Sequence, residues 1–97
     1  YICHPSMAND SLSGVVLAVE IYKKLTKNKN SKYNYRFLFT PETIGTICFL
    51  KNNKEIVKDN IEYGLVATCV GDSGGFTYKK TRNNKSNINR VVEYVFQ

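Results

Sequence analysis

The stretch YGLVATCV, residues 63–70, is a short run rich in apolar and β-branched residues, and the glycine-rich segment at 71–75 follows it directly. A short apolar run that ends at a glycine turn is typical of a strand buried in a sheet. The run YRFLF, residues 35–39, has the same character. Residues 76–80 favour a third strand, and residues 1–3 resemble the end of a further one. The apolar pattern therefore predicts a sheet.

Helical spacing occurs between these runs. Residues 15–25 repeat apolar side chains every three or four positions, after serines that can cap a helix. Residues 43–53 and 54–62 favour shorter helices, and Ser86 precedes a last apolar helical face. Strands that alternate with helices predict an α/β fold of three layers, with helices packed on a sheet. We expect one domain segment of this kind over residues 1–97, because the chain is too short for two domains.

Composition narrows the class of protein. The chain has no apolar stretch long enough to cross a bilayer and no signal peptide, so we expect no membrane partner. Its three cysteines lie in apolar runs without metal-ligand spacing, which favours reduced thiols and a cytoplasmic location. The formal charge of +6 comes from lysines scattered over several loops and helix ends. We therefore do not expect a nucleic-acid partner, although a basic surface of this size leaves that alternative open.

Reactive side chains follow the predicted strands. His4 comes after residues 1–3, Glu42 after the second strand and Asp72 after residues 63–70, while Asp10 lies in the loop before the first helix. Functional groups of α/β sheets collect at the carboxyl ends of strands, so these four side chains are expected to gather at one rim.

The segment HPSMANDSLSG, residues 4–14, places an imidazole and a carboxylate on one short loop before a helix, and zinc binds both groups. This segment resembles the metal-binding segment of the zinc aminopeptidases of the M28 peptidase family. The resemblance is closer still to M28-like domains of bacterial proteins that were long described as domains of unknown function. It extends over YRFLFTPETIG (35–45), GLVATCVGD (64–72) and YKKTR (78–82). It implies that the chain is the N-terminal part of a longer peptidase domain.

The resemblance also implies roles for the four residues. His4 would be a terminal ligand of one zinc ion, and Asp10 would bridge that ion to a second one. The peptide bond between Asp10 and Ser11 could be cis. Glu42 would be the general base, and Asp72 would be another terminal ligand. The implied activity is the hydrolysis of a terminal amide bond in a peptide or a peptide-like conjugate, with one or two zinc ions as cofactor.

The sequence departs from the family pattern in three places. Ser6 stands where these aminopeptidases have an aspartate, Thr43 stands where they have a second glutamate, and His4 is the only histidine. These departures favour a second hypothesis, in which the chain is a degenerate metal-binding or non-catalytic interaction domain within a larger protein.

Each site residue also has a purely structural interpretation. His4 could simply end a strand, Asp10 could cap a helix, and Glu42 could be an acid in a first helical turn. Asp72 could belong to a glycine turn. Its segment GDSGG also matches the surroundings of the serine nucleophile in chymotrypsin-like proteases. A serine hydrolase remains only a distant alternative, because such enzymes need a longer chain and a suitably placed histidine.

Overall fold

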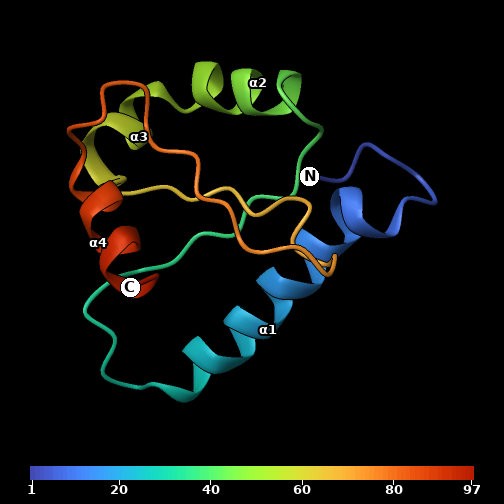
Figure 1. Ribbon diagram of the computed structural model, residues 1–97. Coiled ribbons are helices and arrows are strands. Elements are labelled where there is room, and N and C mark those ends of the chain that lie inside the picture. The colour runs from blue at the N-terminus through green and yellow to red at the C-terminus, as the bar shows by residue number, and fades with distance from the viewer.

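The computed structural model describes residues 1–97 and contains helices joined by extended segments (Figure 1). A kinked helical turn, η1, spans Ala8–Ser13, with non-helical backbone angles at Asp10 and Ser11, and leads directly into α1, Gly14–Lys27. The remaining helices are α2 (Ile44–Asn52), α3 (Lys54–Asn60) and α4 (Asn87–Val95). None of the helices combines the length and the apolar character needed to cross a bilayer.

The helical predictions are confirmed, with ends that differ by a few residues. The helix expected over residues 15–25 is α1, and its last turn carries Lys24 and Lys27, which suit the negative end of the helix dipole. The two shorter helices expected after Pro41 are α2 and α3. The last helix begins after Ser86, whose backbone carbonyl accepts a hydrogen bond from Asn89 N at 3.0 Å.

Gly14 fixes where α1 meets the segment 63–70. This glycine is buried, and a Cβ atom added to it would lie 2.3 Å from the carbonyl oxygen of Ala67. Real Cβ atoms do not approach an oxygen so closely, so only glycine allows this contact between the helix and the extended chain. The serine before it also reaches this segment, because Val70 N donates a hydrogen bond to Ser13 Oγ at 3.1 Å.

The predicted α/β fold with a three-layer arrangement is wrong, because the structure contains no strand. Residues 35–39, 63–70 and 76–80 run extended through the middle of the view in Figure 1, but no ladder of backbone hydrogen bonds joins them. One backbone hydrogen bond joins the N-terminal segment, residues 1–3, to the end of the extended segment after residue 35, and it runs from Ile2 N to Thr40 O at 3.3 Å. An apolar run reports a local preference for extended backbone, whereas a sheet also needs neighbouring backbones in register over several residues.

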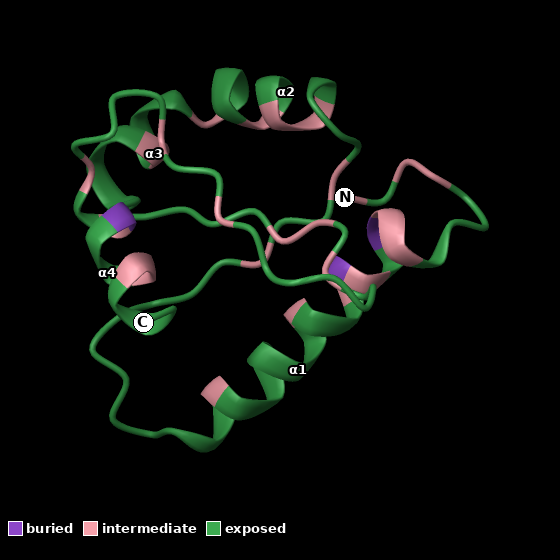
Figure 2. Cartoon of the chain, viewed as in Figure 1, coloured by how far each residue is buried: buried purple, intermediate pink, exposed green.

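The chain leaves most of its apolar side chains in contact with solvent (Figure 2). No hydrophobic residue is fully buried, and Leu65, Val66 and Phe76 expose 67%, 69% and 75% of their surface. The accessible surface is 8529 Å², whereas a folded monomer of this mass exposes about 5,700 Å². The chain thus exposes about half as much surface again as a self-contained domain of its size.

Candidate metal centre

The loop at residues 4–10 brings its histidine and its aspartate together. His4 Nε2 lies 3.9 Å from Asp10 Oδ2, and about a third of each side chain is exposed. The second carboxylate oxygen, Asp10 Oδ1, accepts a hydrogen bond from Ser11 Oγ at 2.6 Å. Ser11 is only 3% exposed, and the Asp10–Ser11 peptide bond is cis. The carboxylate therefore has one oxygen held by a buried hydroxyl and the other directed to the imidazole.

Two further residues, Cys3 and Glu42, lie close to the same histidine. Cys3 Sγ lies 3.0 Å from His4 Nδ1 and accepts a hydrogen bond from Glu42 N at 3.2 Å. One potential ligand atom from each of these three residues lies within 4.8 Å of the others. The bond from Ile2 N to Thr40 O holds the two chain segments beside each other at this point. Residues far apart in the sequence are thus gathered around one imidazole.

Asp72 lies outside that cluster, but it is connected to it through the residue before Asp10. Asn9 Nδ2 donates a hydrogen bond to Asp72 Oδ2 at 2.9 Å, and Asn9 Oδ1 accepts one from Gly71 N at 2.8 Å. The other oxygen of Asp72 accepts a bond from Gly74 N at 2.8 Å. Asp72 therefore has the hydrogen bonds of a turn aspartate, and one amide side chain ties its turn to the loop that carries His4 and Asp10.

We predict that Asn9→Asp destabilises the connection between the two loops by about 1–3 kcal/mol, because it replaces a hydrogen-bond donor with a second carboxylate facing Asp72. Urea unfolding measures this loss, and hydrogen exchange at Gly71 N reports the local opening. The same change at the exposed Asn34 serves as the charge-matched control. The double variant Asn9→Asp with Asp72→Asn reverses donor and acceptor and is expected to recover most of the loss. If the double variant is no more stable than the single one, the Asn9–Asp72 bond does not hold the loops together.

Sequence reasoning missed Cys3 as a member of this centre. All three cysteines lie in apolar runs without metal-ligand spacing, whereas the structure places the thiol of Cys3 between His4 and Glu42 and leaves Cys48 and Cys69 exposed. The available signal was the position of Cys3, which directly precedes His4 in the sequence. The contact with Glu42 could not be found in this way, because it depends on how two distant segments meet.

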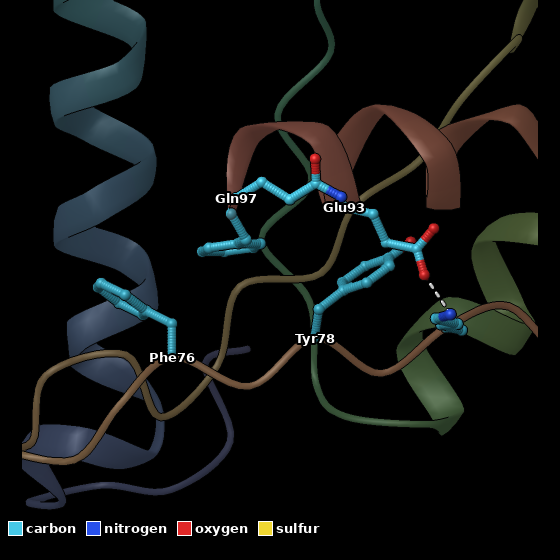
Figure 3. A pocket seen from close by; sticks show the side chains of 6 residues that line it. Phe76, Tyr78, Glu93 and Gln97 are labelled. Atoms are coloured by element: carbon cyan, nitrogen blue, oxygen red, sulfur yellow. Dashed lines mark ion pairs between the residues drawn. The ribbon is translucent and has the colours of Figure 1, made fainter.

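A separate hollow lies between α4 and the extended segment before it (Figure 3). It has a volume of about 520 Å³, and Phe76 and Phe96 line it with ring centroids 6.2 Å apart. Lys80 and Glu93 form an ion pair at its edge. This ion pair gives the basic segment 78–82 a partner within the chain for the charge of Lys80. None of the lining residues belongs to the cluster around His4.

The donor atoms around His4 are of the types that zinc prefers, namely imidazole nitrogen, carboxylate oxygen and thiol sulfur. Zinc–nitrogen and zinc–oxygen bonds are each about 2.0–2.2 Å long, so two ligands of one ion lie about 3.4 Å apart at the tetrahedral angle. The 3.9 Å between His4 Nε2 and Asp10 Oδ2 is longer than a hydrogen bond and about 0.5 Å longer than that separation, so the two atoms would move slightly closer around an ion. The residues present therefore fit a zinc ion.

Comparison with known proteins gives a family and a relative. The family described as "Domain of unknown function (DUF4910)" matches residues 1–97. A protein of Clostridium acetobutylicum, described as a polysaccharide biosynthesis protein with an aminopeptidase-like domain, is 56% identical over 95 residues. The match covers 98% of this chain but only 21% of that relative. No solved structure matches the chain.

Proposed function

Because this chain belongs to the DUF4910 family and a relative in Clostridium acetobutylicum is described as having an aminopeptidase-like domain, we propose that it takes part in metal-dependent amide hydrolysis. The proposed protein is an M28-like zinc peptidase, and the chain supplies part of its catalytic centre. The substrate is a peptide or a peptide-like conjugate with a terminal amide bond. The observation that carries this proposal is the approach of both Asp10 and Glu42 to the His4 imidazole.

In this proposal His4 and Asp10 hold zinc, and Asp72 supplies a further carboxylate. Asp10 is suited to the task because Ser11 Oγ fixes one of its oxygens, which leaves the other free to face the imidazole. Asp72 is less directly placed, since both its oxygens accept hydrogen bonds from Asn9 and Gly74. We include Asp72 because its hydrogen bond with Asn9 joins it to the loop that carries His4 and Asp10. A second ion would need donors beyond this set, because the chain has only one histidine.

Glu42 is the proposed general base. Its carboxylate belongs to an exposed residue beside the imidazole, so water can reach it, and its backbone N–H is fixed by Cys3 Sγ. Zinc held nearby would act as a Lewis acid toward the scissile carbonyl. Glu42 would then accept the proton of the attacking water and pass it to the leaving amine, which a carboxylate within hydrogen-bond reach can do.

The exposed apolar surface supports a place for this chain within a larger protein. The chain spans about a fifth of the length of the curated relative that it matches. The surface in excess of a self-contained monomer is about 2,900 Å²; an interface that covered it would bury about 5,800 Å² over both partners, at the upper end of permanent interfaces. We propose that further polypeptide covers this surface and completes the substrate site. The proposed unit of residues 1–97 is then one segment of a domain.

A non-catalytic interaction domain is the second candidate. Ser6 and Thr43 replace acidic residues of the M28 pattern, and both have positive φ angles, of 65° and 55°. The large exposed apolar surface would serve such a domain equally well. The two candidates differ in one respect, because only the first requires turnover of an amide.

Metal removal tests the proposed function. We expect the full-length protein to hydrolyse aminoacyl p-nitroanilides, to lose at least about 100-fold in rate after dialysis against a chelator, and to recover with added zinc. A fluorophosphonate probe provides the control for Ser73, which we expect to remain unlabelled. Hydrolysis that survives chelation would exclude zinc chemistry. Absence of hydrolysis in zinc-loaded protein would leave the interaction domain.

A further inference from the structure

We propose that Cys3 is a positioning residue that holds the His4 imidazole with its Nε2 atom available to a metal and links it to Glu42. The inference rests on the proposed function, since it concerns the same centre. Its basis is that Cys3 Sγ contacts both residues, with 3.0 Å to His4 Nδ1 and 3.2 Å to Glu42 N. Neither contact was expected from the sequence.

One of the two hydrogen bonds at sulfur has a direction fixed by its donor, and the direction of the other depends on the tautomer of His4. Glu42 N is a backbone amide and can only donate, so sulfur accepts in that bond. In neutral histidine one ring nitrogen carries the proton and the other has a lone pair. If Nδ1–H donates to sulfur, the lone pair is on Nε2, which faces Asp10 Oδ2. Histidines that bind metals generally donate their second N–H to a partner of this kind, which fixes both the tautomer and the ring orientation.

The distances favour positioning over direct ligation by sulfur. Zinc–sulfur and zinc–nitrogen bonds of about 2.3 and 2.05 Å at a tetrahedral angle separate the two ligand atoms by about 3.6 Å. Cys3 Sγ and His4 Nδ1 are 3.0 Å apart, which is a hydrogen-bond separation and leaves no room for an ion between them. The carboxylate of Asp10 also lies on the other side of the ring, at Nε2.

The same sulfur connects the proposed ligand with the proposed base. Glu42 lies at the start of the segment that leads into α2, and the contact of its backbone N–H with sulfur fixes the chain where its side chain begins. Loss of the sulfur would therefore release two residues of the centre together. Serine at this position would keep a hydroxyl that can serve as acceptor for both N–H groups, although a shorter one, whereas alanine would remove the acceptor.

The test uses nitrogen NMR of the metal-free, full-length protein at about pH 8. Signals of His4 are assigned by their loss in His4→Gln. We expect the parent to carry its proton on Nδ1, Cys3→Ser to retain this tautomer, and Cys3→Ala to shift toward the Nε2–H form. Cys48→Ala, which removes an exposed thiol on α2, is the matched control and is expected to leave the tautomer unchanged. A parent with its proton on Nε2, or a Cys3→Ala variant with an unchanged tautomer, would overturn the inference.

Metal titration separates this inference from the proposed function. We expect zinc affinity by calorimetry to fall about 10–100-fold in Cys3→Ala and to recover in large part in Cys3→Ser. Cobalt substituted for zinc is expected to show no thiolate charge-transfer band, and such a band would overturn the inference by making Cys3 a ligand. If the parent binds no zinc but shows the expected tautomers, the proposed function fails while the positioning of His4 by Cys3 stands. If circular dichroism shows that Cys3→Ala does not fold, the tautomer of His4 in the parent and the cobalt spectrum of the parent still test whether Cys3 positions His4.

Discussion

Glu42→Gln is expected to lower the rate of zinc-dependent amide hydrolysis by roughly 10²–10⁴-fold, which is the contribution that a positioned general base makes. Glutamine has nearly the size of glutamate, and its backbone N–H can still donate the hydrogen bond that Cys3 Sγ accepts. The change therefore removes the proton acceptor without removing the contact that places residue 42. Initial rates with an aminoacyl p-nitroanilide measure the effect, and calorimetry with zinc measures metal affinity in the same preparation.

The two measurements together identify the role of Glu42. The M28 pattern has two consecutive glutamates, a base and a ligand, whereas Glu42 is followed by Thr43. A slow variant that binds zinc as tightly as the parent identifies Glu42 as the base. A variant that is slow because zinc binds more weakly identifies it as a ligand and leaves the base role vacant. Glu55→Gln, at an exposed acid in the first turn of α3, is the control. Equal rates in Glu42→Gln and the parent would show that Glu42 has no part in hydrolysis.

The helices could be predicted from the sequence because their signals are local. Apolar side chains three and four positions apart define one face of α1, and such spacing does not depend on the rest of the molecule. The sheet could not be predicted in the same way. The run at 63–70 has the residues of a buried strand, yet Leu65 and Val66 are largely exposed and no ladder forms. Strand pairing is a property of two segments, and an apolar run specifies only one of them.

The candidate centre was partly predictable for a related reason. His4 and Asp10 share one short loop, so their approach to within 3.9 Å follows from local chain geometry. Glu42 was also expected near His4, but at the rim of a sheet that the structure lacks; the two segments instead meet through a backbone hydrogen bond between residues 2 and 40 and the contact of Glu42 N with Cys3 Sγ. Asp72 stays apart because the amide of Asn9 lies between its turn and the loop. The sequence identified the types of residue, and the long-range contacts decided which of them meet.

The largest expected effect on metal binding comes from His4 and Asp10. A residue that only positions a ligand contributes about 10–100-fold to metal affinity, so loss of the ligand itself is expected to cost on the order of 100-fold or more. His4→Ala removes the only imidazole of the chain. Asp10→Asn is the finer change, because an amide oxygen can still accept the bond from Ser11 Oγ while the negative charge is lost. Calorimetric titration of zinc into the full-length protein measures both.

The controls for this prediction use the same chemistry elsewhere in the chain. Asp59→Asn changes an exposed aspartate near the end of α3 and is expected to leave zinc affinity unaltered. Asp72→Asn then measures how much the third carboxylate contributes to zinc affinity. A loss similar to that of Asp10→Asn would mean that Asp72 exchanges its hydrogen bond with Asn9 for the metal, whereas a loss of only a few-fold would leave it as the turn aspartate of the structure. Unchanged zinc affinity in both His4→Ala and Asp10→Asn would remove the metal centre from the loop at residues 4–10, and the peptidase proposal with it.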